Sequence, residues 1–209
     1  RWTGGVTLQH YGSAGMDLDA YGSTLAAKKS WFMFDDEVVC LGAGISCSSA
    51  ATVQTTVENR KLSSSNTNTF TLDGTVMSSS LGWSNYASSA GWCALGGAGG
   101  YYFPSRAGVK MIRQARTGSW SLLNTGGSTT TATRNYLTLW FDHGAKPANA
   151  SYSYVLLPNF SSSQVSAYAA APDIEIIENS TDVQAVRETG LGVVAANFWN
   201  SGTRTADLI

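Results

Sequence analysis

The sequence predicts an all-β fold, a large and mostly antiparallel β-sandwich. Short β-branched and aromatic runs recur along its 209 residues, separated by clusters of Asp, Gly and Ser. No segment keeps a helical period over three turns. Charged residues make up 13% of the chain, while Gly, Ser and Thr are abundant, a composition typical of turn-rich β-proteins. Because a few strands cannot bury both faces alone, the pattern requires a facing sheet.

The clearest strands lie in residues 26–61. Residues 31–34 form an apolar and aromatic run behind a basic pair, and residues 37–45 follow an Asp-Asp turn. Residues 52–61 then alternate β-branched and polar side chains, as expected for a half-buried strand. These three segments predict consecutive antiparallel strands.

The rest of the chain continues the same pattern. A hairpin is expected around the Asp73-Gly74 dipeptide, which favours a tight turn. The low-complexity residues 125–133 predict an exposed loop. No composition break marks a linker, so residues 1–209 are expected to form one domain. Further strands are predicted at residues 5–10, 14–20, 92–94, 109–117, 120–123, 135–142, 152–157, 165–171, 174–178, 183–187 and 193–197, and the final TADLI is strand-like.

Several motifs together resemble one known family. The segment KKSWFMFDDEVVCLGAGI, followed by TTVENRK, resembles the central β-domain of the polysaccharide lyases that cleave hyaluronan, chondroitin and xanthan. The resemblance continues through residues 2–11, 100–104, 114–120, 142–158 and 191–199. It implies a β-sandwich of the supersandwich type and an enzyme that performs β-elimination at a uronic acid.

The same resemblance implies where the chemistry resides. In this family an Asn neutralises the uronate carboxylate, and a His and a Tyr transfer protons, all on an N-terminal α/α toroid. An Arg of that toroid and a Glu from the start of the β-domain assist. None of these residues can be placed on this sequence. The chain is therefore expected to be the central β-domain of a secreted lyase for hyaluronan, or for chondroitin, truncated at both ends. It would support the substrate cleft beside the missing toroid and be inactive alone.

An autonomous lyase is an alternative. The segment after residue 142 contains His143, Asn149, Tyr152 and Tyr154, which are residue types suited to proton transfer and carboxylate neutralisation. The favoured interpretation is structural, with His143 near a strand end and a buried, hydrogen-bonded tyrosine. Catalysis by this set requires the side chains to converge in a cleft.

A non-catalytic carbohydrate-binding module is a second alternative, because aromatic faces stack on sugar rings. Trp2, Trp83 and Trp92 lie beside Gly or Ser and are candidates for this role. Three further tryptophans lie within apolar runs and are expected in the core: Trp31, Trp140 and Trp199.

Basic residues supply the other substrate-binding candidates. Lys28, Lys29 and Arg60 could attract an anionic polysaccharide, although short basic runs are more often solvated strand ends. Glu58 is not matched to the family's catalytic Glu and is expected to pair with Arg60.

Composition also limits other functions. The net charge of −1 gives no reason to expect nucleic acid as a partner, and no apolar run is long enough to span a membrane. Two distant histidines and three cysteines suggest no metal site and no cofactor. The cysteines form no disulfide framework, and a bridge between Cys40 and Cys47 is left open.

Overall fold

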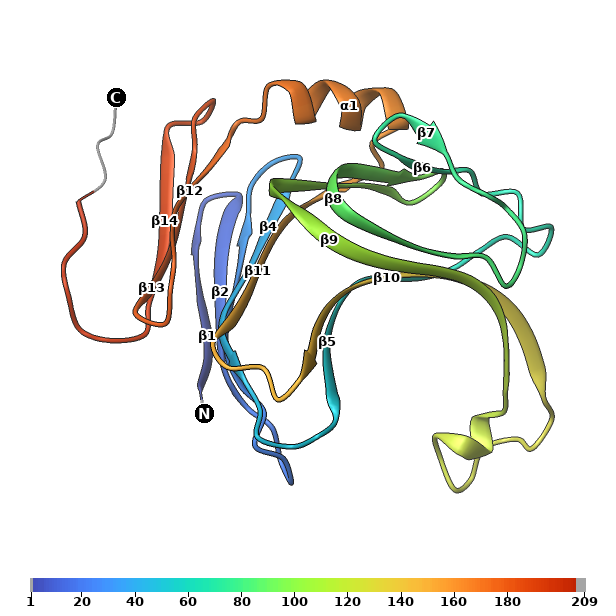
Figure 1. Cartoon of the computed structure of the whole chain (residues 1–209). Helices are drawn as coiled ribbons and strands as arrows, with labels where there is room; N and C mark the ends of the chain where they lie inside the picture. Colours follow the sequence, from blue (N-terminus) through green and yellow to red (C-terminus); the bar gives the residue numbers. More distant parts are fainter. Residues whose placement is uncertain (1, 206–209) are drawn as a thin grey trace.

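A computed structural model describes residues 2–205, and the TADLI segment predicted to be strand-like lies largely outside this range. Residues 2–205 form an 11-stranded sheet and a three-stranded sheet, and every strand pair within this range is antiparallel. Figure 1 shows the small sheet beside the first strands of the large one, with a short helix across the top. The predicted all-β, antiparallel fold is confirmed.

The elements follow in chain order. The large sheet contains β1 (Trp2–Leu8), β2 (Tyr11–Asp19), β3 (Ala26–Met33), β4 (Val38–Ser46), β5 (Thr52–Lys61), β6 (Phe70–Leu72), β7 (Thr75–Val76), β8 (Ser84–Leu95), β9 (Gly99–Gly118), β10 (Ala132–Ala145) and β11 (Ala150–Pro158). A 3₁₀ turn, η1 (Trp120–Leu122), and a helix, α1 (Ser162–Ala170), accompany it. The small sheet contains β12 (Ile174–Asn179), β13 (Val183–Glu188) and β14 (Val193–Phe198).

The large sheet forks at its longest strand. Its main path runs β1-β2-β3-β4-β11-β9-β8-β6-β7, while β10 pairs with both β9 and β5. The 20-residue β9 pairs with β11 near its start and with β10 near its end. Two arms therefore share β9, one through β11 and one through β10, and the second curves away in Figure 1.

The core has two parts because strand side chains alternate between faces. Phe32, Val39 and Val155 belong to the cluster that packs against α1 and the small sheet. Cys40 and Tyr152, on neighbouring strands, belong to the larger cluster on the other face. Cys40, Cys47 and Cys93 are all free thiols, so the possible Cys40–Cys47 bridge is absent.

The prediction of a strand at residues 165–171 is wrong, because α1 occupies this segment. Ser161 caps the helix by accepting a hydrogen bond from the backbone N–H of Gln164, whose side chain returns to the N–H of Ser161. This capping box and the alanine-rich run favour helix over strand. Fully buried Val165 packs onto Gly100, where an added Cβ would lie 2.1 Å from the Val165 Cγ2. The helix is too short to show a clear period.

The strand predicted at residues 120–123 is also wrong. Trp120 and Leu122 belong to η1, which lies at the tip of the β9–β10 hairpin and is exposed. An apolar run without a neighbouring strand cannot form a ladder, so a single 3₁₀ turn forms instead.

The Asp73-Gly74 hairpin is confirmed between β6 and β7. Both residues have positive φ, 44° and 82°, as a tight hairpin turn of the primed kind requires. The Asp73 carboxylate also accepts hydrogen bonds from the backbone N–H groups of Gly91 and Trp92. The turn is thereby fastened to β8.

A buried polar seam joins the two sheets. The Ser30 hydroxyl donates to Gln184 Oε1 at 2.6 Å, and Gln184 Nε2 donates to Asn179 Oδ1 at 2.8 Å. Asn197 Nδ2 donates to the Ser30 Oγ at 2.9 Å, and the Ser13 hydroxyl donates to Asn197 Oδ1 at 3.0 Å. We call this set, Ser13, Ser30, Asn179, Gln184 and Asn197, the seam.

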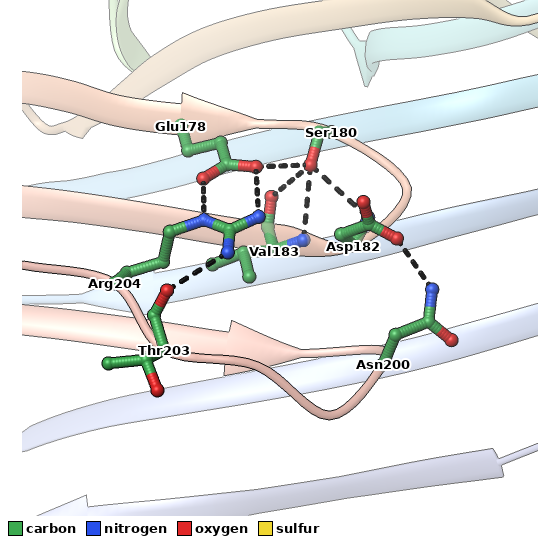
Figure 2. Close-up of polar contacts among 7 residues, drawn as sticks. All are labelled: Glu178, Ser180, Asp182, Val183, Asn200, Thr203 and Arg204. Atoms are coloured by element: carbon green, nitrogen blue, oxygen red, sulfur yellow. Dashed lines mark hydrogen bonds and ion pairs between the residues drawn. The ribbon is translucent and has the colours of Figure 1, made fainter.

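The segment after β14 returns to the β12–β13 turn, as Figure 2 shows. Arg204 pairs with both carboxylate oxygens of Glu178, with Nε at 2.5 Å and Nη2 at 3.2 Å. Asn200 Nδ2 donates to Asp182 Oδ1 at 2.6 Å, and Ser180 donates to Glu178 at 2.6 Å. Exposed polar contacts thus hold this segment against the small sheet. Within residues 2–205, no helix has the length and apolar character needed to cross a membrane.

Candidate functional site

The fork in the large sheet opens a groove. β9 pairs with β11 up to Tyr102 and with β10 from Lys110, so between these points only β8 neighbours it. The ends of β10 and β11 that face this gap also have one free edge each. The groove has a volume of about 840 Å³. It is lined by Tyr86, Ser105, Arg106, Ala107, Gly108, Lys110, Phe141, Asp142, His143, Gly144, Ser151, Tyr152, Ser153, Ile176 and Asn179.

Two ion pairs lie at the groove. Lys110 Nζ lies 2.5 Å from Asp142 Oδ2, and Arg106 Nη2 lies 3.1 Å from Asp73 Oδ2. The hydrogen bond from Lys110, aided by the Gly144 N–H, lowers the pKa of Asp142, which is therefore an anion at neutral pH. Arg106 has a left-handed backbone, with φ at 47°, a conformation that costs energy outside glycine and clusters at functional sites.

His143 and Tyr152 both line the groove, with ring centroids 6.5 Å apart. The Nε2 atom of His143 is 2.9 Å from the Thr55 hydroxyl, and burial lowers the pKa of His143. Tyr152 is buried and stacks on Phe141 with centroids 5.7 Å apart. Burial raises the pKa of Tyr152 well above its usual range. This tyrosine is therefore a poor proton donor or acceptor near neutral pH.

The other two predicted catalytic residues lie outside the groove lining. Asn149 occupies a turn with φ at 62°, and its backbone N–H donates to the Ser46 hydroxyl. Tyr154 packs against the core, and burial strongly raises its pKa. Among residues 2–205, His143 makes no hydrogen bond to Asn149, Tyr152 or Tyr154. The structure brings two of the four residues together but forms no proton-transfer set.

The tryptophans proposed for sugar binding are in three different settings. Trp2 is 52% exposed and meets Trp199 edge-on, with centroids 5.8 Å apart. Trp83 packs on Phe70, and Trp92 is partly buried near α1. They form no single row. The tryptophans expected in the core are partly buried, and the indole N–H groups of Trp140 and Trp199 are buried without a partner in the described chain.

The predicted basic residues have nearby partners. Lys28 pairs with Asp17 at 2.7 Å, and Arg60 pairs with Glu58 at 2.8 Å, as expected for the latter pair. The Lys29 ammonium lies 5.7 Å from the ring centroid of Trp31, and burial lowers its pKa. These residues do not line the groove.

Sequence reasoning missed Arg106, Lys110 and Asn179. Asn179 reaches the groove from the small sheet, with Nδ2 donating to the carbonyl oxygens of Tyr152 and Gly42. No catalytic or sugar-binding motif marks these residues, because the groove arises where β9 changes partners. Within residues 2–205, no group of three or more His, Cys, Asp or Glu side chains is placed to hold a metal ion.

Comparison with known families agrees with the observed fold. The family model described as "Polysaccharide lyase family 8, super-sandwich domain" matches residues 1–169. The model described as "Polysaccharide lyase family 8, C-terminal beta-sandwich domain" matches residues 175–209. The chain therefore belongs to polysaccharide lyase family 8. That residues 1–209 fold as one domain stays a prediction.

Individual relatives agree. A xanthan lyase of Bacillus sp. (strain GL1) is 49% identical over 207 residues, covering 95% of this chain and 22% of the relative. A hyaluronate lyase of Thermasporomyces composti is 41% identical over 203 residues, covering 97% of this chain and 26% of the relative. The structure of a Paenibacillus xanthan lyase superposes with a TM-score of 0.94 at 51% identity, covering 98% of this chain and 20% of that one. The chain thus spans about a quarter, or less, of these relatives.

Proposed function

We propose that this chain is the supporting β-domain of a lyase that cleaves a uronic-acid polysaccharide by β-elimination. Membership of the lyase family carries this proposal. The remainder of a longer protein, the α/α toroid expected from the family resemblance, would supply the base, the acid and the carboxylate neutraliser. The β-domain would form one wall of the cleft.

The side chains support a non-catalytic role for the isolated chain. Elimination needs a base near the C5 proton and an acid near the leaving oxygen, both with a pKa suited to the working pH. His143 has a suitable ring, but its Nε2 contacts Thr55, and the nearby Tyr152 is buried with a raised pKa. A lone histidine cannot complete the reaction.

The choice of polysaccharide substrate rests on the comparison of relatives. Sequence motifs favoured hyaluronan, with chondroitin as the other choice. The identity to the xanthan lyase, 49%, exceeds the 41% to the hyaluronate lyase. We therefore rank a xanthan-type polysaccharide first and hyaluronan second. Both are large anionic polymers that cells meet outside the membrane, so we propose that the protein is secreted.

A lyase assay tests the proposal. The purified 209-residue chain and its full-length parent are incubated with xanthan, hyaluronan and chondroitin, and the unsaturated uronate is followed by ultraviolet absorbance. We expect product from the parent and none from the chain. A rate proportional to the concentration of this chain, and abolished by His143→Ala, would show that the chain is an enzyme by itself. A parent that cleaves none of the three polymers would overturn the assigned reaction.

A further inference from the structure

A second hollow lies on the α1 side of the large sheet. It has a volume of about 490 Å³, within the range of ligand pockets. Arg106 lies on the rim that it shares with the fork groove. The hollow is lined by Asp73, Gly91, Trp92, Tyr102, Phe103, Pro104, Arg106, Ser166, Ala169 and Ala170. We call it the Trp92 hollow.

The Arg106 guanidinium is held in place from one side. Nε donates to the Ser89 hydroxyl at 3.0 Å, and Nη2 donates to the Ser89 carbonyl at 2.6 Å and to Asp73 at 3.1 Å. The Nη1 atom has no hydrogen-bond partner among residues 2–205, and the side chain is 58% exposed. Two N–H donors of a fixed guanidinium are therefore available to a ligand.

Gly91 makes room for this arrangement. A Cβ at position 91 would lie 2.6 Å from Arg106 Nη1, so a larger residue would displace the guanidinium. The Asp73 carboxylate accepts from the N–H groups of Gly91 and Trp92 as well as from Arg106. Asp73 also lines the hollow, and its carboxylate charge is shared among these three donors, while the Arg106 Nη1 has no carboxylate partner among the described residues.

Aromatic rings form the floor. Trp92 and Tyr102 are directly opposite each other on β8 and β9, and both are partly exposed. Tyr102 meets the Tyr168 ring edge-on at 5.6 Å, which fixes its orientation. Its hydroxyl has no hydrogen-bond partner in the described part of the chain. Trp92 and Tyr102 thus offer ring surface and polar donors together, a combination common at binding surfaces.

The end of α1 adds acceptors. The last carbonyl groups of a helix have no partner within the helix, and Ala169 and Ala170, the last two residues of α1, line the hollow. A small inorganic anion would find donors but also these electron-rich carbonyls. A sugar ring, with an apolar face and several hydroxyl groups, matches donors, acceptors and aromatic floor at once.

We propose that the Trp92 hollow is a non-catalytic binding site for one acidic sugar residue. The ring packs on Trp92, the carboxylate accepts from Arg106 Nη1, and hydroxyl groups donate to the carbonyl groups of α1. The choice of an acidic polysaccharide as ligand rests on the proposed function. The site would hold a polymer chain to the β-domain without taking part in elimination.

Binding to the 209-residue chain tests this directly. Titration calorimetry and tryptophan fluorescence measure the affinity for a glucuronate-containing hyaluronan hexasaccharide and for the same oligosaccharide with its carboxyl groups reduced to alcohols. We expect the reduced ligand, and the Arg106→Gln variant, to bind at least tenfold more weakly. The matched control is Arg204→Gln, which removes another exposed Arg–carboxylate pair and should not change the affinity.

Thermal unfolding checks that each variant is folded. Acrylamide quenching of tryptophan fluorescence is a second measurement, and it does not depend on a change at Arg106. Saturating hexasaccharide should protect Trp92 from collisional quenching by acrylamide, compared with a Trp92→Phe variant that retains an aromatic ring. No binding by the unmodified chain, equal affinity for the reduced ligand, or full affinity in a folded Arg106→Gln variant would each overturn the inference. Because these assays involve no cleavage, binding by the chain with an inactive parent would contradict only the lyase proposal.

Discussion

The seam between the sheets and the Trp92 hollow both contain hydrogen-bonding side chains, but they differ in how completely the donors and acceptors of these side chains are paired. In the seam, Gln184 is fully buried and uses both ends of its amide, accepting from Ser30 and donating to Asn179. In the hollow, Arg106 uses three donors on the protein and leaves Nη1 free.

The difference separates architecture from recognition. A buried network in which each member has its partner fixes how two sheets pack, and any unpaired member is costly. A side chain held by some of its donors, with others facing an open hollow, is prepared for a ligand without further ordering. The seam and the Trp92 hollow are therefore distinguished by whether their polar groups all have hydrogen-bond partners, more than by residue type.

The largest expected effect is in the seam. Gln184→Ala removes the partner of Ser30 and Asn179 in a fully buried position. We expect a loss of about 2–4 kcal/mol in the free energy of unfolding, from unpaired polar groups and a cavity. Urea denaturation measures this loss, with Gln54→Ala, at an exposed position of β5, as the control. A loss no greater than in the control would show that the seam does not stabilise the packing.

Asp73→Asn should have a smaller effect. Asn at position 73 keeps one oxygen acceptor and, like Asp, tolerates the positive φ of this turn. It loses the negative charge that pairs with Arg106. We expect about 1 kcal/mol of destabilisation by urea denaturation. A change as large as that of Gln184→Ala would mean that the hollow is as closed a network as the seam.

The groove histidine should give a modest dependence of stability on pH. Burial lowers the pKa of His143 in the folded chain, so the unfolded chain binds the proton more readily. Its contribution to stability is thus fully present above the unfolded pKa of about 6.5 and is lost as the pH falls through the folded value. Denaturation at pH 7.5 and at pH 5 measures this. A His143→Gln variant with the same decrease would assign the effect to other groups.

The smallest effect is expected at the exposed contact of Figure 2. Arg204 lowers the pKa of Glu178, so this contact is present above the usual Glu range and is lost as the pH falls. Arg204→Gln should leave global stability unchanged and increase hydrogen exchange only in the segment after β14. Faster exchange in β13 as well would show that the contact supports the sheet itself.

Prediction from sequence succeeded where a short rule was sufficient. Apolar runs around the Asp-Asp turn located β3 and β4, alternation located β5, and the Asp73-Gly74 dipeptide located its hairpin. It failed at α1, where the signal was a capping box of Ser161 and Gln164 rather than a period. The groove and the Trp92 hollow depend on which strands β9 joins and on a strained Arg106, and local patterns do not encode these long-range pairings.

Strand β9 has one more consequence. Because it pairs with β8, β11 and β10 along its length, the two arms of the large sheet share a single unbroken strand. A protease that cuts the exposed segment between η1 and β10 would divide the polypeptide, yet β9 and β10 would stay joined by the ladder from Lys110 to Gly118. The nicked protein would then migrate as two pieces under denaturing conditions while remaining one particle in solution.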